Sequence, residues 1–514
     1  MPGEGLNDVG EGYSTGMALV YVFNLIVGTG ALAMPKAIKQ AGWLIGLLMV
    51  IFIAFMSLVT ATMTIEALAC ANALSKWSEK QKRDKSKSIA NGPNGPNLSE
   101  LDTIEVPDDT TVSPTNNDKQ HLITETSQTK ESGGGDYYEI KERIEFGQMA
   151  SMFFHKSGVV AFYLVIVVYL YGDLAIYGAA VPKSVRDVIC NFNPNNQTLN
   201  ITNATLEETG PCFKGQPNGM TRFGMYQIML TVFFILMLPF AFFNVQKTKW
   251  LQIGTSVLRW VSFLTMICIA ISRIAKGKIA HPSVANTAGI PNLFGACIYS
   301  FMCHHSLPSL ISPVRNKDKV TALFVADYSL ILGFYTLVSM TAVYAFEDLQ
   351  DLYTLNFSPN TVSDVDIPTG WIWIKYFIAL FPAFTISANF PIIAITLRNN
   401  LKTLIQSKIP PTHEYVDRLL YPLLAIVPPI IIVYFTNDVS VLVGITGAYA
   451  GAGIQYLLPA FLVWQARKQL DAIFGSLRNK HASPFKGSVW VWLTVAWCFL
   501  ALIFVTWDLI EAHT

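Results

Sequence analysis

Eleven long, mostly apolar runs recur along the chain, and they constrain its fold more than any other feature. The hydrocarbon core of a bilayer is about 30 Å thick, and a helix of about twenty residues crosses it. We therefore predict an all-α integral membrane protein with eleven transmembrane helices. The predicted spans cover residues 14–37, 43–74, 157–182, 223–243, 248–272, 288–312, 319–345, 370–397, 417–435, 438–464 and 488–510.

The composition agrees with a membrane location. Of the 514 residues, 52% are hydrophobic and only 14% are charged, which is more apolar surface than one soluble core of this size needs. The net charge of +1 gives no electrostatic reason to expect a nucleic-acid partner. The expected surroundings are therefore the lipid bilayer, and we expect a monomer.

Basic residues are distributed unevenly between the loops. Lys and Arg cluster after spans two, four, six, eight and ten, and the positive-inside rule predicts that these loops are cytoplasmic. The loop after span seven carries five acidic residues and no Lys or Arg, as expected for the opposite side. Arg273, Lys276 and Lys278, after span five, oppose this scheme. The majority predicts a cytoplasmic N-terminus and a luminal or extracellular C-terminus.

Polar segments divide the chain into three parts. Residues 1–76 hold the first two spans, and residues 157–514 hold spans three to eleven. Between them, residues 77–156 are rich in Lys, Asp, Ser, Asn and Thr, so we predict a disordered cytoplasmic loop that ends in an amphipathic lead-in along the interface. Residues 187–221 form a predicted luminal loop.

The predicted luminal loop carries two signs of an oxidising compartment. Asn196, Asn200 and Asn203 each begin an N-x-Thr acceptor for glycosylation. Cys190 and Cys212 bracket these acceptors, and in such a compartment a disulfide between them is expected over two free thiols. We therefore predict a glycoprotein with one disulfide bond.

A short acidic motif in the predicted cytoplasmic loop has the form of a sorting signal. Asp118 is followed, four and five residues later, by Leu122 and Ile123, the spacing of an acidic dileucine signal. The alternative is an unremarkable linker. The motif favours an endosomal or lysosomal membrane over the plasma membrane, with sorting adaptors as partners.

Two spans carry helix-breaking residues near their middle. Gly28, Thr29 and Gly30 interrupt span one, and residues 303–308 (CHHSLP) interrupt span six, five spans later. Unwound backbone at membrane depth is tolerated where it lines a cavity, and paired breaks indicate a transporter with inverted repeats. Spans one to five and six to ten would be the halves, with span eleven as an addition. The alternative is that Gly28 and Gly30 simply allow close helix packing.

These two stretches resemble a known family. Residues 24–35 (NLIVGTGALAMP) resemble the first-helix signature of the amino acid/auxin permease family, and residues 299–310 (YSFMCHHSLPSL) resemble its broken sixth helix. The resemblance covers most of the chain outside the cytoplasmic loop. It implies a LeuT-like core, a 5+5 inverted repeat plus one extra helix, with helices one and six broken.

The resemblance also implies which residues bind substrate and ions. The residues expected around an amino acid's carboxylate and amine are Val27, Gly28, Thr29, Gly30, Ser300, Phe301 and Cys303. In sodium-coupled relatives a cation lies between the first-helix break and hydroxyls of span eight, which here would be Thr385 and Ser387, backed by Asn389. The alternative for these hydroxyls is a hydrogen bond to a preceding carbonyl of their own helix.

Proton coupling is the competing expectation, and it requires a titratable group. His304 lies at the second break, although it could equally be a hydrogen-bonded helix cap. Asp173, Glu66 and Asp327 lie at membrane depth, where a charge is costly enough to suggest a function. Asp173 is the strongest of the three. We expect no cofactor, and sodium and proton both stay open as coupling ions.

These observations predict a secondary active transporter of amino acids or similar small zwitterions that works by alternating access. The alternative is a nutrient-sensing receptor that binds an amino acid and signals through its cytoplasmic loop. We do not expect an enzyme, because the sequence shows no metal-ligand spacing, nucleophile elbow or phosphate loop.

Overall fold

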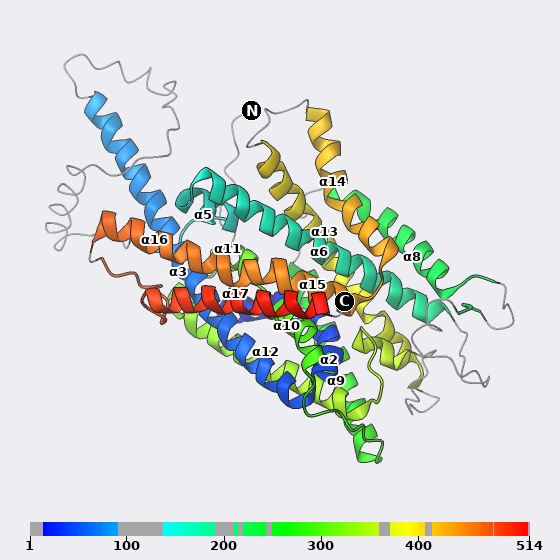
Figure 1. Ribbon diagram of the computed structural model, residues 1–514. Helices are drawn as coiled ribbons and strands as arrows, with labels where there is room; N and C mark the ends of the chain where they lie inside the picture. Colours follow the sequence, from blue (N-terminus) through cyan, green and yellow to red (C-terminus); the bar gives the residue numbers. More distant parts are fainter. Residues whose placement is uncertain are drawn as a thin grey trace.

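The computed structural model describes residues 14–90, 137–190, 210–213, 219–242, 249–358, 371–406, 414–475 and 477–511. Within these ranges the regular structure is helical, apart from an isolated bridge between Pro211 and Thr221. The helices pack into one bundle (Figure 1). The all-α prediction is therefore confirmed.

Each predicted span coincides with helix. In chain order the spans are α1 (Thr15–Ile26) with α2 (Thr29–Ala41), α3 (Trp43–Ala90), α6 (Lys156–Ile189), α8 (Arg222–Met237), α9 (Lys249–Ala275), α10 (Ile290–Ser300) with α11 (Leu307–Ile311), α12 (Val320–Ala345), α13 (Trp373–Gln406), α14 (Glu414–Phe435), α15 (Val439–Thr446) with α16 (Leu458–Phe474), and α17 (Ser488–Glu511). Among the described residues, eight helices are long and apolar enough to cross a membrane, or nine with the bent pair α1 and α2. The other two predicted spans coincide with α14 and with the pair α10 and α11. The chain is a multi-pass membrane protein.

Both predicted breaks are present. Helices α1 and α2 meet at an angle of 52°, with Val27 and Gly28 between them. Helix α10 ends at Ser300, and α11 begins only at Leu307, after a short 3₁₀ turn that starts at His304. Because α2 packs directly on α10, the two broken spans lie side by side.

Glycine allows α10 to approach span ten unusually closely. A Cβ atom on Gly295 of α10 would lie 1.9 Å from the carbonyl oxygen of Gly444 in α15. Span ten then continues through two π-helical turns, Gly447–Gly451 and Gly453–Leu457, before α16 begins. Any larger residue at position 295 would push these two spans apart.

One end of the bundle gathers three of the loops predicted to be cytoplasmic, and we call it the predicted cytoplasmic end. Lys76 Nζ donates to the carbonyl oxygen of Glu139 at 2.8 Å, and Gln469 Nε2 donates to that of Phe153 at 3.2 Å. Ser312 Oγ, after α11, donates to the carbonyl oxygen of Glu142 at 3.3 Å. Loops that follow spans two, six and ten therefore meet here.

The opposite end, the predicted luminal end, holds the one basic loop that opposed the charge scheme. Arg273 Nε donates to the carbonyl oxygen of Ala345 at 3.2 Å, and its guanidinium lies 4.7 Å from the centre of the Phe346 ring. Trp43 N bonds Ser283 O at 3.1 Å at the same end. The loop after span five therefore lies at the same end of the bundle as the loop after span seven, as expected if successive spans cross in alternating directions.

The predicted disorder from residue 77 onward is wrong for residues 77–90, because α3 continues to Ala90. Figure 1 shows α3 in blue, running past α5 and α16 toward the upper left. Trp77 is buried, and Glu79 pairs with Arg83 one turn later at 3.5 Å. Helix-favouring Lys, Arg, Gln and Glu residues account for the rest of the extension. Asp118, Leu122 and Ile123 lie outside the described residues.

The predicted amphipathic lead-in contains a short helix, α5 (Phe146–Phe153). A capping box formed by Glu145 and Gln148 fixes its start. Phe146 and Met149 are buried, and α5 packs on α3, α6 and α16. The lead-in is therefore part of the bundle's packed surface.

The predicted disulfide between Cys190 and Cys212 is present. It ties the end of α6 to the chain just before α8, and Met225 of α8 packs against it. Asn196, Asn200 and Asn203, the predicted glycosylation acceptors, lie outside the described residues.

Candidate substrate-binding site

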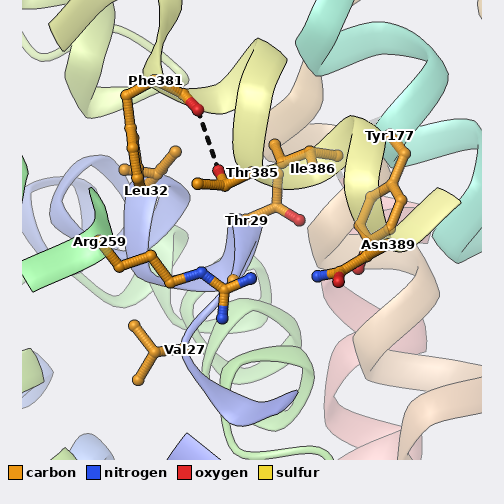
Figure 2. A pocket seen from close by; sticks show the side chains of 10 residues that line it. Val27, Thr29, Leu32, Tyr177, Arg259, Phe381, Thr385, Ile386 and Asn389 are labelled. Carbon is orange, nitrogen blue, oxygen red and sulfur yellow. Dashed lines mark hydrogen bonds between the residues drawn. The ribbon is translucent and has the colours of Figure 1, made fainter. Parts of the chain in front are cut away.

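A small cavity lies beside the first break, between four spans. Its volume is about 10 Å³, which is room for about one water molecule. Figure 2 shows the lining side chains, which come from α2, α6, α9 and α13 and from the break itself. The lining residues are Val27, Gly28, Thr29, Leu32, Tyr177, Arg259, Phe381, Thr385, Ile386 and Asn389.

The two glycines of the first break have different surroundings. A Cβ atom on Gly28 would meet nothing within 4 Å, so this residue presents bare backbone to the cavity. A Cβ atom on Gly30 would lie 2.4 Å from Ser300 Oγ, so this glycine allows α2 to pack on α10. Gly28 therefore fits the prediction that the break lines a cavity, and Gly30 fits the alternative that glycine allows close helix packing.

The start of α2 is suited to an anion. No side chain caps this helix at Gly28, so its first N–H groups have no side-chain acceptor. The N-terminus of a helix carries a partial positive charge and attracts carboxylate groups. Val27, Gly28 and Thr29, all predicted to bind substrate, line the cavity at this point.

Arg259 is the charged cavity residue that the sequence analysis did not predict. It comes from α9, is 2% exposed, and points its guanidinium into the space near Thr29 and Asn389 (Figure 2). It donates to the carbonyl oxygen of Asn24 and lies 3.4 Å from the Asn24 side-chain oxygen. Within the described part of the chain it forms no ion pair with a carboxylate. Its position inside predicted span five was the signal that could have identified it.

Helix α13 brings two of its three predicted ion-coupling residues to the cavity. Thr385 and Asn389 are one helical turn apart and both line it, whereas Ser387 is not among the lining residues. Two helical positions correspond to about 200°, so Ser387 projects from a different face. Thr385 Oγ1 donates to the carbonyl oxygen of Phe381 at 3.0 Å (Figure 2), which is the ordinary intrahelical bond of a membrane hydroxyl.

The second break supports the first break but does not line the cavity. Tyr335 OH lies 2.9 Å from both the Ile26 and the Ser300 carbonyl oxygens and so ties the two breaks together. The Phe301 carbonyl oxygen accepts from Ser57 Oγ at 3.1 Å, and Cys303 Sγ lies 3.2 Å from the Tyr328 hydroxyl. Ser300, Phe301 and Cys303 are completely buried by these contacts.

Tyr299 connects the cavity to Asp173. Its hydroxyl donates to Asp173 Oδ1 and lies 3.4 Å from Thr29 Oγ1, which belongs to a lining residue. Asp173 is 4% exposed, and Tyr177, one turn further along α6, lines the cavity. A predicted ion-coupling residue therefore lies one hydroxyl away from the candidate substrate site.

The other titratable residues at membrane depth have separate surroundings. His304 is fully buried beside α3, with Nε2 2.9 Å from Thr60 Oγ1. Glu66 accepts from Arg467 at 2.8 and 2.7 Å, which marks it as a structural ion pair. Both carboxyl oxygens of Asp327 have no hydrogen-bond partner among the described residues. None of the three lines the cavity.

The cavity combines one buried cation with several neutral polar groups. Thr29, Tyr177 and Asn389 offer hydrogen bonds, and the remaining wall is apolar. In the described ranges no group of three or more His, Cys, Asp or Glu residues could hold a metal ion. This arrangement is chemically suited to a small anion or zwitterion.

A helical membrane bundle with two adjacent broken spans and such a cavity has the form of a small-molecule transporter. The family model for transmembrane amino acid transporter proteins matches residues 11–95 and 120–506, and the chain belongs to this family. The family is named for transport, which agrees with the expectation of a non-enzyme. A small-molecule substrate and a lipid environment follow from membership.

Curated relatives match along the full length. The chain is 46% identical to Transmembrane protein 104 of Gallus gallus over 518 residues and covers 99% of each protein. It is 46% identical to Transmembrane protein 104 of Homo sapiens over 527 residues, covering 100% of both. The Transmembrane protein 104 homolog of Drosophila melanogaster is 42% identical over 524 residues, with 97% of each covered.

Among solved structures, MhsT in complex with L-phenylalanine matches with a TM-score of 0.48 and 12% identity. The match covers 97% of this chain and 99% of that one. The resemblance to an amino acid transporter family that the broken-helix motifs suggested is confirmed by the family model.

Proposed function

We propose that this chain is a secondary active transporter of amino acids or similar small zwitterions, coupled to protons, and that it works by alternating access. The single observation that carries the proposal is Arg259, a buried guanidinium in a cavity beside the first break.

The substrate carboxylate has two partners in the cavity. The guanidinium of Arg259 offers charge-assisted hydrogen bonds, and the N–H groups at the start of α2 add a partial positive charge beside Gly28. Tyr177, Thr29 and Asn389 remain to bind the ammonium group through their oxygen atoms. A zwitterion is thereby matched at both of its charges.

Sodium binding is disfavoured at the same place. A sodium ion held between the first break and span eight needs backbone carbonyl and hydroxyl oxygens. Here the guanidinium already uses the Asn24 carbonyl oxygen and shares a cavity with Thr385. A fixed positive charge in a site of low dielectric constant repels a second cation strongly. We propose that Arg259 makes transport independent of sodium.

Asp173 is the proposed proton carrier. A charge at the bilayer centre costs about 2.5–3.5 kcal/mol or more, and Asp173 is buried with the Tyr299 hydroxyl as its hydrogen-bond donor. Its protonated form is neutral and suits a closed site. Because Tyr299 also contacts Thr29, binding at the cavity and loss of the proton can affect each other through two hydroxyl groups.

The cavity volume indicates what the transport cycle must do. Space for about one water cannot hold an amino acid, so the side chains around Gly28 have to separate when substrate enters. The break between α1 and α2 is the natural place for this movement, because few backbone hydrogen bonds have to be broken there.

The proposal is tested by uptake of a panel of amino acids into vesicles that contain the purified full chain. We expect saturable uptake of at least one amino acid, with competition by other amino acids but not by their carboxamides, which lack the negative charge. Saturable binding without uptake would contradict transport and favour the nutrient-sensing receptor.

The membrane location completes the proposal. We propose an endosomal or lysosomal membrane, with the N-terminus in the cytoplasm and the C-terminus in the lumen. The sorting motif at Asp118, Leu122 and Ile123, the charge distribution of the loops and the disulfide between Cys190 and Cys212 support this assignment. Sorting adaptors are the proposed partners of the cytoplasmic loop.

A further inference from the structure

A second, larger cleft lies at the predicted cytoplasmic end and shares no lining residue with the cavity. Its volume is about 510 Å³, and it is open on one side. Three loops form it: the segment before α5, the loop between α11 and α12, and the loop between α16 and α17. We call it the basic cleft, after Arg315, Lys317, Lys480 and His481 in its lining.

Basic side chains outnumber acidic ones in the lining of the basic cleft. Glu139 and Asp318 are its two carboxylates, and Arg315, Lys317 and Lys480 are its three permanent cations. Lys141 lies 3.1 Å from the Glu139 carboxylate, and Lys76 Nζ donates to the Glu139 carbonyl oxygen. Lys317 is attracted by Glu139 and repelled by Lys141 and Lys76. The cleft thus brings several like charges close together.

The fold holds these repelling groups together. The segment before α5 is tied to the α11 region by Arg143, which donates to Ser309 Oγ at 3.1 Å, and by the bond from Ser312 Oγ to the Glu142 carbonyl. The loop after α16 is shaped by Asn479, whose side-chain oxygen accepts from His481 N at 2.8 Å. An anion with more than one negative charge would relieve this repulsion without any rearrangement of the backbone.

We propose that the basic cleft binds a multiply phosphorylated ligand of the inositol phosphate class. Phosphate groups match a cluster of Lys and Arg, and the Arg315 guanidinium can bind one in bidentate fashion. Basic pockets at the cytoplasmic ends of membrane helices are suited to lipid headgroups of this class. The same chemistry occurs in the free headgroup, so the source of the ligand is a matter for experiment.

The test uses the purified full chain in phosphatidylcholine nanodiscs. Three probes are compared: soluble inositol trisphosphate, inorganic phosphate, and nanodiscs that also contain a phosphatidylinositol bisphosphate. The test variant is Lys317→Ala/Lys480→Ala. The matched control is Lys319→Ala/Arg478→Ala, which removes the same charge from the same two loops at exposed positions outside the cleft.

We expect the wild type to bind the inositol probes and the test variant to bind them about thirtyfold more weakly, from roughly 1 kcal/mol for each lysine. The control variant should bind like the wild type. Glu139→Gln/Asp318→Asn removes both carboxylates and should bind more tightly, which keeps the test valid if the lysine variant does not fold.

The outcomes also separate the possible sources. Binding of soluble inositol trisphosphate at the affinity of the lipid supports a free phosphate ligand, and binding of the lipid alone supports a headgroup held at the membrane. Either result supports the cleft. Equal losses in the test and control variants, or a wild type that binds inorganic phosphate and the inositol probes equally weakly, would overturn the proposal.

Discussion

At the scale of single residues, the two glycines of the first break should respond differently to substitution. Gly28→Val adds a side chain beside the cavity whose Cβ atom would meet nothing within 4 Å, so the protein should fold and lose substrate uptake. Gly30→Ala forces a Cβ atom to within 2.4 Å of Ser300 Oγ, so we expect loss of about 1–3 kcal/mol of stability. Thermal unfolding and uptake of the same preparations measure both effects.

Two controls sharpen this comparison. Gly254→Ala, on α9, also adds a Cβ atom that meets nothing within 4 Å, but away from the cavity, and should leave uptake unchanged. Normal uptake by Gly28→Val would remove this residue from the substrate site. Full stability of Gly30→Ala would show that α2 and α10 are not packed as described.

Arg259 is expected to act through its charge and its two-pronged geometry. Because a hydrogen bond to a charged group contributes about 1.5–3 kcal/mol, Arg259→Ala should raise the apparent KM about tenfold to a hundredfold. Arg259→Lys keeps the charge but loses the fork of donors, so its KM should lie between that of the wild type and that of Arg259→Ala. If Arg259→Ala transports with an unchanged KM, the guanidinium does not bind the substrate carboxylate.

The residues of the site were only partly predictable. Glycine and proline in an apolar run predicted the break, because their effect on a helix depends on little else. Ser387 was expected from the family resemblance but is not among the lining residues, since a resemblance does not fix which hydroxyl of a helix faces the cavity. Arg259 was not predicted, because a single charge among the apolar residues of span five belongs to no local motif that marks a binding site.

At the scale of elements, α6 carries an ion pair at the predicted luminal end. Lys183 Nζ lies 2.6 Å from Asp351 Oδ2, both side chains are buried, and Asp351 also accepts from Val439 N at 3.0 Å. The pair thus joins α6, the loop after α12 and the start of α15. Breaking a buried pair by removing one partner costs about 3–5 kcal/mol.

Lys183→Met should therefore destabilise the protein by about 3–5 kcal/mol, and Lys183→Met/Asp351→Asn should recover most of the loss. Arg83→Met is the control, because Arg83 lies 3.5 Å from Glu79, both side chains are exposed, and such pairs contribute about 0–1 kcal/mol. Unfolding midpoints in detergent measure all three variants. Equal effects at Lys183 and Arg83 would contradict the role of the buried pair.

The same ion pair predicts a pH dependence of stability. Burial alone raises the pKa of a carboxyl group, but the adjacent Lys183 ammonium outweighs this effect and holds the pKa of Asp351 below its ordinary value of 3.8. A carboxyl group whose pKa is lower in the folded state than in the unfolded state stabilises the protein at any pH above its unfolded-state pKa. This stabilisation is lost as the pH falls through the folded-state pKa. The contribution of Asp351 should thus be the same at pH 7 and pH 5 and disappear only below about pH 4. An Asp351→Asn variant that loses its stability deficit already at pH 5 would contradict this assignment.

Helices were predicted more reliably than their ends. Each predicted span coincides with helix, and nine of them, counting the bent pair α1 and α2 as one, are long and apolar enough among the described residues to cross a bilayer. The extension of α3 to Ala90 was not foreseen, since charged residues such as Lys82 and Arg83 suit a solvated helix as well as a loop. The packing of α5 on α16 depends on contacts between distant segments that no local pattern encodes.

At the scale of the whole molecule, the two broken spans lie against each other and differ in role. The first break opens on the cavity, whereas the second is completed by α3 and α12 and holds the first in place through Tyr335. The Tyr299 hydroxyl connects Thr29, at the first break, to Asp173. We propose that a fixed cation at Arg259 replaces sodium and that Asp173 carries the coupled proton.

The most direct test measures amino acid accumulation in vesicles while the sodium and proton gradients are varied separately. We predict that the wild type accumulates substrate under an inward proton gradient, equally well when choline replaces sodium. Asp173→Asn should lose this accumulation and keep exchange of substrate across the membrane. Accumulation that requires a sodium gradient and ignores the proton gradient would contradict the account.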